Sequence, residues 1–223
     1  MHCEKGVDMR NKKRRTPKKL LLVLHIFCEG AKTEPNYIAR YKDLFCGNAI
    51  AIKVEKTDKN TPVQLVQTAV CSKESGANSS LDEYWVVYDR ESPMKYSERL
   101  HAQARDLARQ NGICIALSNV CFEVWLLLHK QATCAACNTC AELLARNDFK
   151  VAFRGYEKGG SCTLTREQIK QARERAKRLN ANTIVCANKD WNVPSKWNPY
   201  TDVYKLLEAI DLFLGRLSVN VAQ

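Results

Sequence analysis

An apolar run that ends abruptly in a carboxylate and a glycine constrains this chain more than any other feature. Residues Leu20 to Phe27 are apolar except for His25, and Glu29 and Gly30 follow almost directly. The run is too short to cross a bilayer and lacks the alternation of a half-buried strand. It predicts a strand buried on both faces, as in a parallel sheet covered by helices. Functional groups in such sheets lie beyond the carboxyl ends of the strands, so we expect Glu29 at the rim of a crevice.

The segments that follow alternate between strands and helices. Short apolar runs predict strands, and apolar residues at helical spacing predict helices. The predicted strands are 49–54, 84–88 and 113–117, and the predicted helices are 34–46, 62–75 and 97–110. This order with short connections predicts an α/β fold with a doubly wound parallel sheet of about four strands.

Beyond Asp148 the alternation stops and the chain is mostly helical. Helices are predicted over Arg166–Leu179 and Val203–Leu217, separated by a loop that contains Trp191 and Trp197. The expected organisation is a basic, disordered arm at residues 1–19, an α/β catalytic core at 20–130 and a helical C-terminal extension at 131–223 that packs on the core.

The positive charge is concentrated in two segments. The chain has a formal net charge of +11, and basic residues outnumber acidic ones both in the arm, which includes Arg14 and Arg15, and on the helix with Arg166, Lys170 and Arg173. A solubilising tail and a solvated helix face would explain each cluster separately. Together they favour nucleic acid as a partner, held through phosphate contacts that carry little sequence information.

The composition is typical of a globular protein in a reducing compartment. Hydrophobic residues make up 45% of the chain, and no run is long enough to span a membrane. The beginning, Met-His-Cys-Glu-Lys, lacks the apolar stretch of a signal peptide, so we expect a cytoplasmic protein with no membrane partner. Several of the 11 cysteines lie inside apolar runs and are interpreted as buried thiols, not disulfides.

Three carboxylates are expected at one edge of the sheet. Glu29 follows the first strand, and Asp89 and Glu91 follow the third. Mg²⁺ or Mn²⁺ needs hard oxygen ligands, and an Asp-x-Glu pair at a strand end can direct both side chains toward one point. Glu29 could complete the cation site or act as general acid or base. Helix capping or ordinary surface charge is the simpler interpretation of the spacing alone.

Several segments resemble the RloB-like family of bacterial defence proteins. The resemblance extends over residues 20–210 and is carried by Cys28–Tyr37, Val86–Glu91, Ser118–His129, Gly155–Lys158 and Asn198–Val203. Because the family is related to the Toprim domains of topoisomerases, primases and small nucleases, the resemblance implies a Toprim-like sheet. The resemblance implies that Glu29 corresponds to the conserved glutamate of Toprim domains. It likewise implies that Asp89 and Glu91 correspond to the two acidic positions of their Asp-x-Asp motif. It also implies an AAA or ABC-type ATPase partner from a phage-defence locus.

The chain departs from the family pattern at two positions. Glu91 replaces the usual aspartate, which moves its carboxylate by about a bond length. Asn119-Val120 stands where the family has Asn-Pro. Neither change removes a charge, so a metal site is still expected.

Two further residues are candidates for catalysis. Glu123 is flanked by apolar residues, where a buried charge is costly unless it is paired, so it is expected to bind metal indirectly or to orient Lys158. Lys158 precedes a glycine-rich loop and could neutralise charge on a scissile phosphate, although a surface lysine is the simpler alternative.

Lys32 is a candidate for phosphate binding at a helix N-terminus. His129 is either a core residue or part of the site.

A cysteine cluster offers a second metal hypothesis. Cys134, Cys137 and Cys140 could bind Zn²⁺ with His129 or Cys162 as fourth ligand. The segment lacks the usual glycine or lysine knuckle, so the start of a helix through Leu143 and Leu144 is the preferred interpretation.

The carboxylates and basic segments predict a Mg²⁺- or Mn²⁺-binding protein that contacts nucleic acid, and the resemblance implies a nuclease that acts on RNA such as tRNA, or on DNA, in anti-phage defence. The predicted catalytic residues are Glu29, Asp89, Glu91, Glu123 and Lys158, of which Glu29, Asp89 and Glu91 bind the metal. The predicted nucleic-acid contacts are Lys32, Arg90, Arg166, Lys170, Arg173, Arg14 and Arg15. The alternatives are a non-catalytic nucleic-acid-binding subunit of an ATPase complex and an enzyme acting on small nucleotides; homodimerisation is left open.

Overall fold

A computed structural model describes residues 22–47, 51–55, 57–58, 61–75, 81–160, 164–189 and 192–221, with residues 218–221 described through the backbone alone. The basic arm with Arg14 and Arg15, together with Cys162 and Trp191, lies outside these residues.

A five-stranded sheet runs through the centre of the molecule in the order β2-β1-β3-β4-β5. Its strands are β1 (Leu24–Cys28), β2 (Ile52–Glu55), β3 (Glu83–Asp89), β4 (Cys114–Asn119) and β5 (Tyr200–Thr201). The first four strands are parallel, and the short β5 pairs with the end of β4 in the antiparallel direction. The carboxyl ends of β1, β3 and β4 therefore share one edge.

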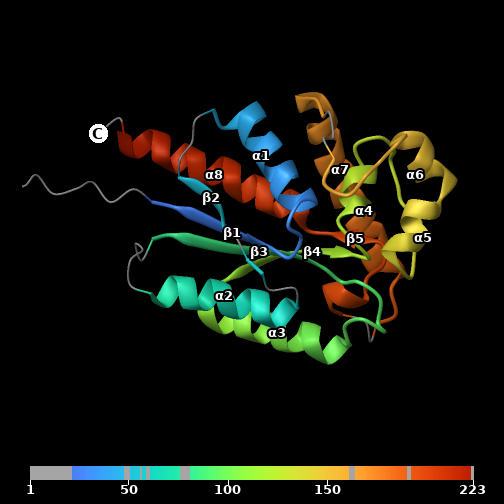
Figure 1. Ribbon diagram of the computed structural model, residues 1–223, viewed down its shortest axis with the longest axis horizontal. Coiled ribbons are helices and arrows are strands. Elements are labelled where there is room, and N and C mark those ends of the chain that lie inside the picture. Colours follow the sequence, from blue (N-terminus) through green and yellow to red (C-terminus); the bar gives the residue numbers. More distant parts are fainter. Residues whose placement is uncertain are drawn as a thin grey trace, which may run out of the picture.

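Helices cover both faces of the sheet (Figure 1). One face is covered by α2 (Pro62–Glu74) and α3 (Glu98–Asn111), and the other by α1 (Thr33–Phe45) and α8 (Val203–Val221). The remaining helices gather at the carboxyl-terminal end of the strands; they are α4 (Glu123–Leu127), α5 (Cys140–Ala145), α6 (Asn147–Ala152) and α7 (Arg166–Cys186), with a 3-10 turn at Pro194–Lys196.

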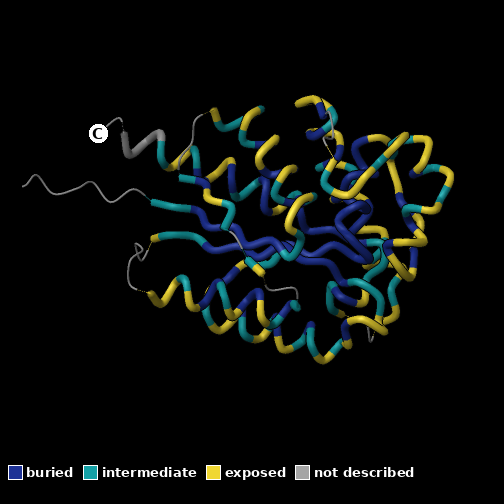
Figure 2. Tube along the Cα trace, viewed as in Figure 1, coloured by how far each residue is buried: buried dark blue, intermediate teal, exposed yellow. Residues whose placement is uncertain are grey.

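Strand alternation divides the core into two hydrophobic clusters. Trp85 and Val87 pack with residues of α1, α4, α7 and α8, whereas Val86 and Tyr88 pack with residues of α2 and α3. Figure 2 shows the strands as the most continuously buried part of the chain. Successive side chains of a strand point to opposite faces, so both faces of β3 must be apolar. This is the physical reason for the uninterrupted run Tyr-Trp-Val-Val-Tyr.

Local sequence signals explain where the helices begin and end. The Thr61 side chain accepts a hydrogen bond from the Gln64 backbone N–H at the start of α2, with proline in the first turn. The Thr165 side chain caps α7 in a capping box with Gln168. The residue after α3, Gly112, adopts the left-handed conformation with φ 62°, which glycine adopts without steric cost.

The structure confirms the predicted α/β fold, with flanking helices and a helical C-terminal part. One helix is longer than predicted. Whereas the prediction ended it at Leu179, α7 continues to Cys186, and Val185 in its last turn is 83% exposed. Among the described helices, none is long and apolar enough to span a membrane.

Candidate functional site

An acidic cleft lies at the carboxyl ends of β1 and β3. It has a volume of about 380 Å³ and is lined by carboxylates and lysines from the β1–α1 loop, α1, the end of β3, the β3–α3 loop, α4 and the α6–α7 loop. The carboxylates are Glu29, Glu34, Asp89, Glu91 and Glu123, and the lysines are Lys32, Lys95 and Lys158. The five predicted catalytic residues thus line one cleft, although their roles stay predictions.

The end of β3 sends consecutive side chains to opposite faces of the sheet. Asp89 continues the row of Trp85 and Val87 and therefore faces the acidic cleft, while Arg90 continues the row of Val86 and Tyr88 toward α3. Backbone hydrogen bonds hold this strand end against the β4–α4 connection: Arg90 N–H donates to Ser118 O at 2.8 Å, and Glu91 N–H to Val120 O at 2.9 Å. Asp89 consequently belongs to the acidic cleft, whereas Arg90 belongs to the opposite face of the sheet.

Asp89 is a buried carboxylate among other carboxylates. Its relative exposure is 8%, and burial raises its pKa, with further increases from the charges of Glu34, Glu123 and Glu29. Within the described residues, no donor forms a hydrogen bond with either carboxylate oxygen of Asp89. A buried anion without a partner is costly, so this position favours either a proton or a bound cation.

Glu29 is fixed by two hydrogen bonds at the rim of the cleft. Its Oε2 accepts from the Asp89 backbone N–H at 3.0 Å, and its Oε1 accepts from the Tyr96 hydroxyl at 3.2 Å. Burial raises the pKa of Glu29 to about 7, an increase that those hydrogen bonds and the charge of Lys95 only partly oppose. A carboxyl group with this pKa exchanges its proton near neutral pH.

Glu34 is a site residue that the sequence reasoning missed. It is 5% exposed, its pKa is raised by burial, and its carboxylate folds so closely over Gly30 that a Cβ there would lie 2.1 Å from Glu34 Oε2. Gly30 is therefore needed for this close approach. A signal was present in the sequence, because Glu34, Ile38 and Tyr41 recur at the spacing of one buried helix face.

Glu91 lies at the outer side of the cleft. It adopts a left-handed backbone conformation with φ 56°, and its Oε1 pairs with Lys95 Nζ at 2.7 Å. Non-glycine residues rarely adopt this conformation, which is found preferentially at functional sites. The carboxylate is 20% exposed, so it is less buried than Asp89.

Glu123 faces the cleft from the first turn of α4. It is 2% exposed, its Oε1 accepts from the Tyr156 hydroxyl at 2.8 Å, and Lys158 Nζ lies 4.0 Å from the same oxygen. Burial lowers the pKa of Lys158, but the combined charges of Glu123, Cys140, Cys121 and Asp89 more than offset this effect, so the pKa is raised overall. That Glu123 orients Lys158 for catalysis stays a prediction.

The RloB-like protein family matches residues 24–210 of the chain. The chain belongs to the RloB-like family. This confirms the family inferred from the sequence. No curated protein and no solved structure shows significant similarity to the chain. The match includes every residue that lines the acidic cleft of this RloB-like protein.

The predicted phosphate contacts of the RloB-like chain fall into two groups. Lys32 is exposed at the cleft, and Arg166 and Lys170 are exposed on α7. Arg90 was expected to contact nucleic acid, but it is 7% exposed, and it donates to Ser195 O and Tyr96 O, each at 2.9 Å. Its guanidinium is therefore used inside the fold, which corrects that prediction.

Arg173 is also committed to contacts within the protein. Its guanidinium pairs with Asp211 at 2.8 Å and donates to the Tyr41 hydroxyl. The ion pair joins α7 to α8, so the prediction of a phosphate contact at Arg173 is corrected as well. The sequence showed a basic helix but not which of its residues face α8.

The structure decides between the alternatives left open for the cysteine cluster and for His129. The Cys134 and Cys137 thiols donate to the Ala135 carbonyl, and in the described part of the chain they form no metal-ligand group with Cys140. Cys140 instead begins α5, as the helical interpretation predicts. His129 is a core residue that shares a hydrogen bond with Tyr37, and burial lowers its pKa to about 4.

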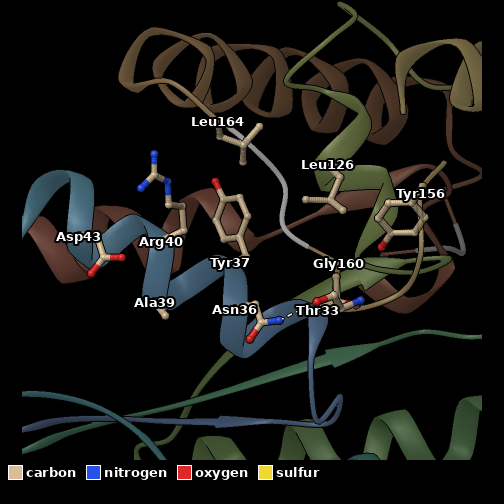
Figure 3. A pocket seen from close by; sticks show the side chains of 11 residues that line it. Thr33, Asn36, Tyr37, Ala39, Arg40, Asp43, Leu126, Tyr156, Gly160 and Leu164 are labelled. Atoms are coloured by element: carbon tan, nitrogen blue, oxygen red, sulfur yellow. Dashed lines mark hydrogen bonds between the residues drawn. The ribbon is translucent and has the colours of Figure 1, made fainter. Parts of the chain in front are cut away.

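A second pocket adjoins the acidic cleft through Thr33, which lines both. It has a volume of about 330 Å³ and lies between α1, α4 and the α6–α7 loop (Figure 3). Tyr37 and Arg40 of α1 enter it from one side and Tyr156 from the other. The loop is attached to α1 by Gly159 N–H, which donates to Thr33 Oγ1 at 3.0 Å.

Proposed function

We propose that this RloB-like protein is a metal-dependent nuclease that hydrolyses phosphodiester bonds of RNA such as tRNA, or of DNA, as an effector of anti-phage defence. The family membership supports the defence context, and the acidic cleft supports the chemistry. The observation that carries the proposal is Asp89, a buried carboxylate surrounded by other carboxylates at the end of a central strand. Such an arrangement favours the uptake of a proton or of a cation, and a cation is the neutralising group that also supplies the proposed chemistry.

The donor set fits Mg²⁺ or Mn²⁺. Five carboxylates line the cleft, and hard divalent cations prefer oxygen ligands of this kind. Glu123, Glu34 and Asp89 are the most buried of the five, with Glu29 and Glu91 nearer the rim. A cation held there would supply positive charge to the phosphate oxygens of the substrate. Glu34 is thereby added to the predicted metal ligands Glu29, Asp89 and Glu91.

Glu29 is suited to accept a proton from the attacking water. A pKa of about 7 leaves a large fraction of the carboxylate deprotonated at neutral pH, while the group stays basic enough to take up a proton. The Tyr96 hydroxyl and the Asp89 backbone N–H hold its two oxygens in fixed directions. The reaction therefore needs no covalent nucleophile from the chain.

Lys158 and Lys32 are suited to bind the phosphate that is cleaved. The Lys158 side chain is 57% exposed and lies at the cleft beside Glu123, so it can turn toward a ligand without leaving its loop. Lys32 lies against Gly159 of the same loop, where a Cβ would come within 2.4 Å of the lysine side chain. Both ammonium groups can stabilise negative charge that increases during the reaction.

Longer-range contacts with the polyanion are assigned to Arg166 and Lys170 on the exposed face of α7 and to the basic arm at residues 1–19. An AAA or ABC-type ATPase that restrains the nuclease until infection is proposed from the family resemblance alone. Homodimerisation is left as an open prediction, because it rests on no structural observation.

The test is cleavage of labelled tRNA, single-stranded DNA and duplex DNA with Mg²⁺ or Mn²⁺, with and without the ATPase. We expect Asp89→Asn and Glu29→Gln to lower cleavage by about 10²-fold or more while binding is retained. Glu167→Gln, an exposed change on α7, is the matched control and should cleave normally. If wild type and Asp89→Asn behave alike, the proposal is wrong.

The alternative of a non-catalytic nucleic-acid-binding subunit is favoured by one observation. Glu91 with Lys95 and Glu123 with Lys158 already form ion pairs inside the cleft. Salt-sensitive binding by wild type with no cleavage of any substrate would support that alternative. Cleavage of small nucleotides that is unaffected by deletion of residues 1–19 would instead indicate a nucleotide-processing enzyme.

A further inference from the structure

Two thiols and a carboxylate meet behind the acidic cleft. Ligand atoms of Cys121, Glu123 and Cys140 lie within 4.8 Å of one another, and the relative exposures of these residues are 0%, 2% and 8%. Cys121 lies between β4 and α4, Glu123 begins α4, and Cys140 begins α5. In the region covered by the structure, these three side chains already lie close enough to share one metal ion.

The hydrogen bonds within the group orient its donor atoms toward a common point. Cys140 Sγ donates to Glu123 Oε2 at 3.4 Å, and the sulfur atoms of Cys121 and Cys140 lie within 4.8 Å of each other. The other oxygen of Glu123, Oε1, accepts from the Tyr156 hydroxyl at 2.8 Å. Tyr156 thus fixes the carboxylate from behind and leaves Oε2 facing the thiols, as an outer-sphere residue does in a metal site.

We propose that Cys121, Cys140 and Glu123 bind a thiophilic divalent cation of the zinc class, at a site separate from the oxygen-lined cation site at Asp89. Two sulfur atoms and one carboxylate oxygen suit Zn²⁺ and are a poor set for Mg²⁺. Three protein ligands leave a fourth position for water or another ligand. Binding replaces the two thiol protons, which are released to solvent.

The proposed site would join segments that are distant in sequence. It would link the start of α5 to the β4–α4 connection, and Glu123 would belong both to this site and to the acidic cleft. Lys158 does not block cation binding at the thiols. Its side chain is 57% exposed, and Nζ lies 4.0 Å from Oε1 of Glu123, the oxygen that faces away from the thiols. A cation at the thiols would therefore fix the position of Glu123 in the cleft.

Cobalt substitution tests the proposal without reference to cleavage. The full-length protein is stripped of metal, kept reduced with a phosphine and titrated with Co²⁺ in the absence of oxygen. We expect a thiolate-to-cobalt charge-transfer absorption that saturates at a single equivalent and is abolished by Zn²⁺ but not by excess Mg²⁺. Absence of this absorption in the wild type would overturn the proposal.

Matched cysteine variants identify the ligands. Cys140→Ser should lose the absorption, whereas Cys134→Ser and Cys137→Ser, which change buried thiols outside the group, should keep it. Tyr156→Phe should weaken Co²⁺ binding by about 10-fold through loss of the outer-sphere hydrogen bond. The reverse pattern, with loss in Cys134→Ser and Cys137→Ser but not in Cys140→Ser, would refute the assignment.

X-ray absorption on the zinc-loaded wild type provides a measurement that does not depend on the folding of a variant. Two sulfur neighbours at ~2.3 Å together with oxygen neighbours are expected. A first shell of three or four sulfur atoms, or of oxygen and nitrogen alone, would contradict the proposed ligand set.

Discussion

The raised pKa of Glu29 predicts a specific dependence of stability on pH in the protein freed of divalent cations. Burial raises this pKa from 4.5 to about 7 in the folded state. The folded protein therefore holds the proton of Glu29 more tightly than the unfolded chain does. The stabilisation from this proton is fully present below pH 4.5 and is lost as the pH rises through about 7.

The magnitude follows from the difference between the two pKa values. At ~1.4 kcal/mol per pKa unit, Glu29 accounts for a loss of about 3 kcal/mol in the free energy of unfolding between acidic and mildly alkaline pH. Glu29→Gln keeps the shape and the acceptor oxygen but cannot ionise. The variant should match the wild type near pH 5 and exceed its stability by up to about 3 kcal/mol near pH 8.

Urea unfolding at a series of pH values, with EDTA present, measures this difference. His101 and His129, whose pKa values burial lowers to about 4, give an opposite slope that both proteins share, so it cancels in the comparison. Glu167→Gln on the surface of α7 is the control and should run parallel to the wild type. Parallel curves for wild type and Glu29→Gln would refute the reasoning that Glu29 titrates in a buried site.

Added Mg²⁺ extends the same experiment to the cation site. A ligand that binds only the folded state stabilises it by about 2.7 kcal/mol at a concentration 100 times its Kd. Because protons and the cation compete for the carboxylates, Mg²⁺ should stabilise the wild type near pH 8 and have little effect near pH 5. Equal stabilisation at both pH values would argue against a cation bound by these carboxylates.

Three further substitutions have definite expected outcomes. Gly30→Ala should displace the Glu34 carboxylate and lower Mg²⁺ affinity, measured by calorimetry, by about 10-fold or more, with a small change in thermal stability because the side chain can move. Arg90→Ala should lower the free energy of unfolding by about 1–3 kcal/mol, since it removes the Arg90 donor from the Tyr96 carbonyl and one of the two donors from the Ser195 carbonyl, and should not change the salt dependence of nucleic-acid binding. Gly215→Ala in α8, where a Cβ has no neighbour within 4 Å, should raise the unfolding free energy by about 0.5–1 kcal/mol in urea titrations.

The sequence alone determined the architecture and the edge at which the cleft lies. Apolar runs without alternation can be buried only in the interior of a covered sheet, and the carboxyl ends of parallel strands necessarily meet at one edge. Glu29 and Asp89 could therefore be placed together from their positions after β1 and at the end of β3. The division of the chain at residues 19 and 130 stays a prediction.

Only the tertiary structure decided which polar side chains the fold uses internally. Arginine is a common phosphate-binding residue, but carbonyls of the 3-10 turn and of the β3–α3 loop bind Arg90, and Asp211 of α8 binds Arg173. Cys140 was grouped with its neighbours in sequence, yet it contacts Cys121 and Glu123 from another segment. Periodicity determines which face of an element a residue occupies, whereas the partner on that face depends on how distant segments pack, which no local pattern records.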